Sequence, residues 1–64
     1  MNRIEIRKAI KKANKVYAWV NDTEHDGRYI EVVKKNLILI YDKDFPLDIN
    51  INATLRSDND LYIN

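Results

Sequence analysis

The fold is decided by residues 16–33, which read VYAWVNDTEHDGRYIEVV. The run Val16–Val20 is rich in β-branched and aromatic residues, which favour a strand. A polar segment follows and ends in Asp26-Gly27, a strong turn signal, and Gly27 is the only glycine of the chain. A second run with strand-like alternation extends over Arg28–Val33. The stretch therefore predicts an antiparallel β-hairpin whose connection is longer than a minimal two-residue turn.

A helix is predicted before the hairpin, over residues 2–14. Asn2 is a favourable N-cap, and Glu5 three residues later approximates a capping box. Helical spacing gathers apolar side chains on one face and cations on most of the other. The apolar face holds Ile6, Ala9, Ile10 and Ala13, and the cations are Arg3, Arg7, Lys8, Lys11 and Lys12. Ile4 falls among the cations: either it folds back onto a neighbouring strand, or it is exposed in a basic patch, a composition typical of interfaces.

The two faces of the predicted hairpin differ in chemistry. With a period of two, one face carries Tyr17, Trp19 and Tyr29. If open, this face would be a platform for stacking nucleobases beside a basic helix. Because so short a chain needs its large apolar side chains in the core, we expect the second half of the chain to cover it. The predicted core comprises Ile6, Ile10, Val16, Ala18, Val20, Ile30 and Val32, with the aromatic residues under a second layer.

The second half predicts a helix and another hairpin. Residues 34–44 suit a strand by propensity and a helix by spacing, and we favour the helix because it would cover the second face of the hairpin. Alternation resumes over residues 48–54, residues 57–60 form a turn cluster, and Leu61–Ile63 makes a last short strand. The order α-β-β-α-β-β predicts a single α+β domain over residues 1–64, with the N-terminal helix packed on an antiparallel sheet.

The composition restricts the classes of function. The 64 residues include no cysteine and one glycine, so disulfides, cysteine-based zinc sites and glycine-rich phosphate loops are excluded. Residues 22–26 place three carboxylates beside His25, but consecutive loop residues rarely converge on one ion, so we expect a hydrated loop. We expect no enzyme and no cofactor. The chain has no apolar run of about 18 residues and does not begin like a signal peptide, so we expect a cytoplasmic protein without a membrane span.

The charge is distributed unevenly along the chain. Its net value is +1, but residues 1–15 carry +5, residues 16–33 carry −3, and the remainder carries −1. Such a dipole can steer an anionic partner. The alternative is a solvated helix face that only keeps the protein soluble.

Three segments carry a resemblance: RKAIKKANKVYAWV (residues 7–20), DGRYI (residues 26–30) and DLYIN (residues 60–64). Together they resemble small proteins encoded by bacteriophages and prophages. The resemblance implies a helix after the second strand, and an accessory phage protein that acts on host machinery. Anti-CRISPR inhibitors, which are small and non-enzymatic and cover a surface of a host complex, are one such class.

One leading hypothesis and two alternatives follow. The leading hypothesis is a phage-type inhibitor that binds a host defence complex, such as CRISPR–Cas, by surface contact. Its predicted binding residues are Ile4, Arg7, Lys8, Lys11, Lys12, Asp22, Glu24 and Asp26. The first alternative is a nucleic-acid-binding module in which the helix cations contact phosphates while Tyr17 or Trp19 stacks on bases. The second is a self-assembling structural protein, in which edge strands such as Leu61–Ile63 pair across a homodimer.

Overall fold

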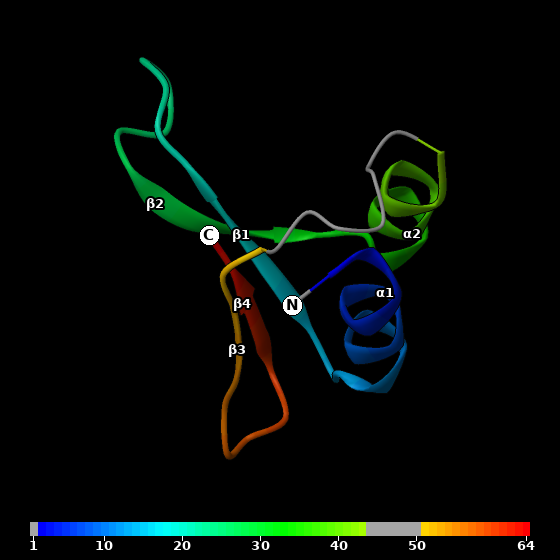
Figure 1. Ribbon diagram of the computed structural model, residues 1–64. Helices are drawn as coiled ribbons and strands as arrows, with labels where there is room; N and C mark the ends of the chain where they lie inside the picture. The colour runs from blue at the N-terminus through cyan, green and yellow to red at the C-terminus, as the bar shows by residue number, and fades with distance from the viewer. Residues whose placement is uncertain (1, 44–50) are drawn as a thin grey trace.

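Figure 1 shows the computed structural model of the chain, which describes residues 2–43 and 51–64. The elements are α1 (Arg3–Lys12), β1 (Val16–Val20), β2 (Arg28–Val32), α2 (Lys34–Lys43), β3 (Ala53–Leu55) and β4 (Leu61–Ile63). The predicted α+β class, the element order and the helix chosen for the ambiguous segment are confirmed. The predicted strand residues 48–50 lie outside the described part of the chain.

Helix α1 begins where its capping signal is. The side chain of Asn2 accepts a hydrogen bond of 3.0 Å from the backbone N–H of Glu5, as an N-cap does. The helix ends at Lys12, because Ala13 already has an extended backbone. Between these ends the amphipathic spacing buries Ile6 and Ile10 completely.

The sheet has the strand order β2-β1-β4-β3. The β1–β2 and β3–β4 pairs are antiparallel hairpins, but β1 and β4 run parallel in the centre, so the expected wholly antiparallel sheet is wrong and the sheet is mixed. Burial explains why β4 is central: Leu61 and Ile63 are both buried, whereas Leu55 of β3 is exposed at the edge. The proposed dimer contact through Leu61–Ile63 is therefore wrong, because both edges of β4 are already paired.

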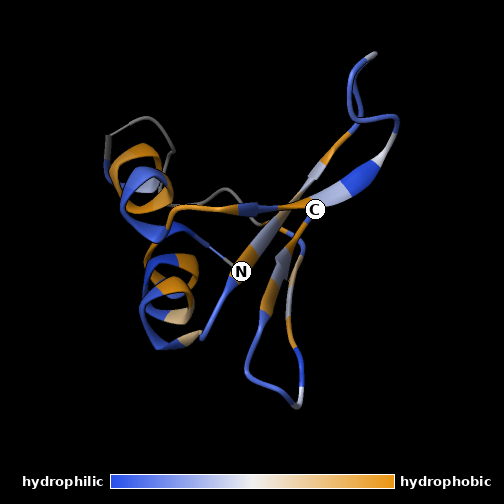
Figure 2. Ribbon diagram, turned by 180° about the vertical axis from the view of Figure 1, so that it is seen from behind, coloured by the Kyte–Doolittle hydropathy of each residue, from blue (hydrophilic) through white to orange (hydrophobic). Residues whose placement is uncertain are grey.

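Both helices lie on the same side of the sheet, as the opposite views of Figures 1 and 2 show. Tyr41 of α2 is buried in the same cluster as Ile6 and Ile10 of α1. Within the described part of the chain, the expectation that the second half covers the aromatic residues is therefore wrong, because α2 lies on the other face of the sheet. A helix about 10 Å across cannot cover four strands spaced about 4.8 Å apart, so α2 is needed beside α1 over the aliphatic face.

The observed core overlaps the predicted one. Ile6, Ile10 and Val16 are buried as expected, while the other predicted strand residues are half-buried. Ala13, Tyr41, Leu61 and Ile63 complete the cluster. Ala18 and Val32 lie on the helix-covered face because they share it with Val16 and Leu61 in the strand register.

Candidate functional site

The sheet face opposite the helices carries four aromatic side chains. The register places Tyr17 of β1 beside Tyr62 of β4, and Trp19 of β1 beside Tyr29 of β2. Residues paired in this way point to the same side of a sheet. We call this surface the aromatic face and define it by the four aromatic residues and Arg56, which follows β3.

The rings of the aromatic face contact one another. Tyr17 and Tyr62 are stacked with centroids 4.9 Å apart, and Tyr29 meets Tyr62 edge-on, also at 4.9 Å. Trp19 extends the cluster with an edge contact to Tyr29 at 5.3 Å. The guanidinium carbon of Arg56 lies 3.9 Å from the centre of the Tyr62 ring. Because β4 lies between β1 and β3, Tyr17 and Arg56 reach Tyr62 from its two neighbouring strands.

The aromatic face remains accessible. Trp19 is 45 % exposed, and the three tyrosines are half-buried. Burial raises the pKa of the Tyr17 hydroxyl above its ordinary value, nearby Lys15 opposes that rise, and Asp60 and Glu31 add to it. Charges of both signs therefore border the face.

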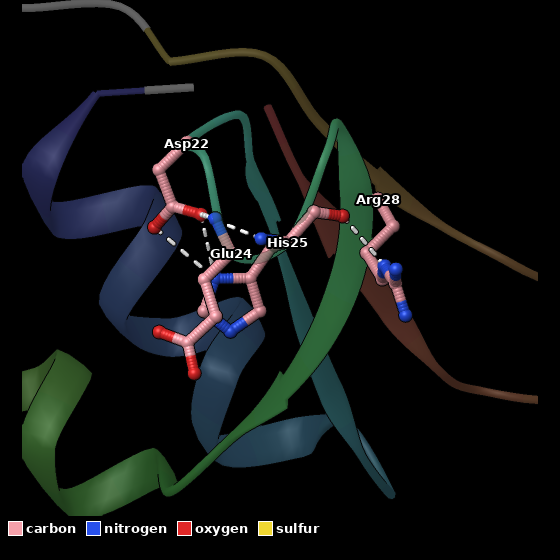
Figure 3. A network of polar contacts seen from close by, with 4 residues as sticks. All are labelled: Asp22, Glu24, His25 and Arg28. Carbon is pink, nitrogen blue, oxygen red and sulfur yellow. Dashed lines mark hydrogen bonds and ion pairs between the residues drawn. The ribbon is translucent and has the colours of Figure 1, made fainter.

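The β1–β2 connection is organised by Asp22, as Figure 3 shows. Its carboxylate accepts hydrogen bonds from the backbone N–H of Glu24 at 3.0 Å and of His25 at 2.7 Å, and it lies 2.9 Å from Nδ1 of His25. The His25 backbone hydrogen bond is the largest cause that lowers the pKa of Asp22, followed by its side-chain contact. Arg28 Nε donates to the carbonyl oxygen of His25 at 2.6 Å, which closes the connection. Asp22 thus shapes its own loop.

The end of this connection is built around Trp19. Asp26 and Gly27 both have positive φ values, 54° and 67°. A Cβ atom on Gly27 would lie 3.2 Å from Cζ2 of Trp19, which is closer than ordinary van der Waals contact. The single glycine therefore serves both the turn and the position of the indole ring, while Glu24 and Asp26 remain exposed.

The other predicted binding residues lie on α1. Lys8, Lys11 and Lys12 are exposed, and Ile4 is 51 % exposed, so the alternative that Ile4 folds back onto a strand is wrong. Arg7 forms an ion pair of 2.8 Å with Asp42 of α2. Arg7 therefore contributes to the contact between the two helices, which limits its availability to a partner.

The structure separates the parts of the predicted site. The helix cations lie on the helical layer, whereas the aromatic rings lie on the opposite face of the sheet. A single surface that combines the basic helix with Tyr17 or Trp19 is therefore wrong. Sequence reasoning missed Tyr62 and Arg56, because β4 was expected at an edge and its pairing with β1 was not predicted. The alternation of Leu61–Ile63 was the available signal, since it turns Tyr62 away from the buried residues on either side.

Comparisons with known proteins add no relative. No family model matches the chain, and neither a curated protein nor a solved structure matches it. Over residues 2–43 and 51–64, no group of three or more potential ligand side chains is placed to hold a metal ion. Neither described helix is long and apolar enough to cross a membrane.

Proposed function

We propose that this protein is a non-enzymatic binding protein that docks a protein partner on its aromatic face. The observation that carries the proposal is a cluster of four aromatic rings that no described helix covers, with Arg56 over one of the rings. Tyrosine, tryptophan and arginine are the residues most enriched among the energetically dominant positions of protein interfaces. A patch of this composition, on a sheet face that neither described helix covers, fits such an interface.

The geometry favours a protein over a single-stranded nucleic acid. Base stacking needs free ring faces beside a positively charged groove. Tyr62 has Tyr17 stacked on it and Arg56 over its ring, so it offers little surface to a base. The cations on and beside the face, Arg56 and Lys15, are balanced by Glu31 and Asp60 at its border, so the face does not attract a polyanion.

Preorganisation supports the same proposal. Side chains that must be ordered on binding each cost about 0.5–1.5 kcal/mol. The rings of the aromatic face are already ordered by contacts at 4.9–5.3 Å. A partner would therefore lose less free energy to side-chain ordering here than on a face of isolated, flexible side chains.

The narrower proposal is a phage-type inhibitor of a host defence complex, acting in the host cytoplasm. It rests on the resemblance of three sequence segments to small phage and prophage proteins. The exposed residues of α1 and of the β1–β2 connection, which the sequence predicts as contacts, are the alternative docking surface for such an inhibitor, and Asp22 is restricted by its role in the loop.

Co-purification with candidate host effectors tests both the docking surface and the narrower defence-inhibitor proposal. We expect an effector to retain the unchanged protein and Lys8→Glu, but to lose Trp19→Ser and Arg56→Glu. Lys8→Glu is the matched control because Lys8 is exposed on the helical layer, away from the aromatic face. Loss of binding in Lys8→Glu alone would move the docking surface to α1. Retention by no effector, together with unchanged phage protection, would contradict the defence-inhibitor proposal.

A further inference from the structure

Three contacts show that α1 and α2 pack as an antiparallel pair. Near the start of α1 and the end of α2, Arg7 pairs with Asp42 at 2.8 Å, and Arg3 donates to the carbonyl oxygen of Asp42. At the opposite end, the Lys34 ammonium donates to the carbonyl oxygen of Ala13. The end of α1 and the start of α2 therefore lie side by side.

This arrangement gathers lysines at one end of the helical layer. Lys11 follows Arg7 by one helical turn, so it borders the same seam between the helices. Lys35 precedes Asp42 by seven residues, close to two full turns, so helical spacing places it on the same side of α2 as Asp42, which pairs with Arg7 of α1. Lys8 and Lys12 flank Lys11 on the outer surface of α1. We call Lys8, Lys11, Lys12 and Lys35 the lysine surface.

The lysine surface carries unbalanced positive charge. All four side chains are exposed, and none forms an ion pair with a residue in the described part of the chain. Asp42 is engaged by Arg7, and Glu5 lies three residues before Lys8 but six and seven residues before Lys11 and Lys12. The turn that carries Asp58 and Asp60 meets α1 at its last residue, because Asn59 donates to the Lys12 carbonyl oxygen at 2.9 Å. The Asp60 carboxylate itself accepts from the backbone N–H of Lys15, beyond the helix, at 3.2 Å.

We propose that the lysine surface binds the phosphate backbone of a nucleic-acid duplex. This inference goes beyond the proposed function, because it concerns the opposite side of the molecule and a different ligand. Lysine is depleted in protein interfaces, whereas its ammonium group binds phosphate as a point charge. A duplex presents one negative charge per about 1.7 Å of its axis, a denser array than an acidic protein offers.

The helical layer favours a duplex over a single strand. Single strands bind through bases stacked on aromatic rings, and the described helices carry one aromatic residue, Tyr41, which is buried. Lys8 and Lys12 are separated by about 6 Å along the axis of α1. The axes of packed helices lie about 8–10 Å apart, which sets the distance between the lysines of α1 and Lys35 of α2. A patch of this size fits about three phosphates.

Fluorescence anisotropy with a short labelled DNA duplex tests the inference. For three phosphate contacts, affinity should fall about 40-fold between about 50 and 200 mM salt. Lys11→Glu should lower the slope of log affinity against log salt by about 1. The matched control is Arg28→Glu, which changes the net charge equally but lies at the far end of β2, and it should leave the slope unchanged. An RNA duplex of the same sequence should behave similarly, since phosphate contacts do not read the sugar.

Four outcomes would overturn the inference. They are an absence of binding at low salt, an equal loss in Arg28→Glu and Lys11→Glu, displacement of the duplex by poly-glutamate at equal charge concentration, and loss of nucleic-acid binding in Trp19→Ser but not in Lys11→Glu. Only the last outcome would also contradict the proposed function, because it would place nucleic acid on the aromatic face. The first three leave that proposal standing.

Discussion

Removal of the Tyr62 ring should weaken both the fold and the proposed docking surface. Tyr62 is the centre of the aromatic face, since its ring stacks with Tyr17, makes a T-shaped contact with Tyr29, and lies under the Arg56 guanidinium. Tyr62→Ala removes all three contacts at once. The backbone of β4 should stay in place, because Leu61 and Ile63 on either side remain buried in the core.

The size of the effect follows from the contacts. Each aromatic pair contributes about 0.5–1.5 kcal/mol beyond its buried area. An exposed cation–π contact adds about 0.5–1 kcal/mol. Because contacts that share one ring are not additive, we expect Tyr62→Ala to lower the free energy of unfolding by about 2 kcal/mol. A domain of this length has about 3–10 kcal/mol in total, so the variant should remain largely folded.

Urea unfolding measures this loss, with Trp19 fluorescence and far-UV circular dichroism as two probes. The second probe is needed because Trp19 belongs to the same ring cluster, through Tyr29, and its emission will respond to the substitution. Tyr62→Phe is the control: it keeps the ring, and no hydrogen bond of the Tyr62 hydroxyl is found among the described residues, so its midpoint should change little. A loss below about 0.5 kcal/mol for Tyr62→Ala, or an equal loss for Tyr62→Phe, would refute the stabilising role of the ring contacts.

Three further substitutions test other parts of the structure by chemical unfolding. Gly27→Ala should lower the free energy of unfolding by about 1–2 kcal/mol, because Gly27 has a φ of 67° and the new Cβ would lie 3.2 Å from Trp19. Unchanged stability would contradict this. Asn59→Ala should lower the free energy of unfolding by about 1 kcal/mol more than Asn59→Gly. Both variants lose the 2.9 Å hydrogen bond to the Lys12 carbonyl oxygen, but only alanine is strained at a φ of 68°. Equal losses in the two variants would count against that strain. Asp22 has a pKa below its ordinary 3.8, so its stabilising contribution is present above that pH and is lost as the pH falls through the lower folded value. Asp22→Asn should therefore flatten the acid side of the stability–pH curve, and an unchanged curve would show that the loop contacts of Asp22 contribute nothing.

The elements were predictable because their signals are local. The capping pair Asn2 and Glu5, the Asp26-Gly27 turn and the alternation of the strands each involve residues close in sequence, and each is found in the structure. The helix over Lys34–Lys43 was less certain from sequence, since a short apolar run fits either structure. The helix, which we favoured because it would cover the second face of the hairpin, is confirmed, but it lies beside α1 and buries Tyr41 against the aliphatic face instead.

The arrangement of the elements was not predictable for a physical reason. Both faces of the β1–β2 hairpin are apolar, so hydrophobicity alone does not say which one the helices cover. The choice depends on β4, which adds Leu61 and Ile63 to the aliphatic face and Tyr62 to the other. The rings can then contact one another and leave their hydroxyl groups to water, a solution that aliphatic side chains do not have.

The openness of the aromatic face is the strongest reason to place function there. A chain of 64 residues buries a smaller fraction of its surface than a larger domain, and it has little apolar surface to leave uncovered. Yet four of its six aromatic residues lie on the face that no described helix covers. Places where a protein departs from the arrangement that stability favours are expected to be functional sites. Because the lysine surface lies on the other side of the sheet, the two proposed ligands, a protein partner and a duplex, would not compete for one surface.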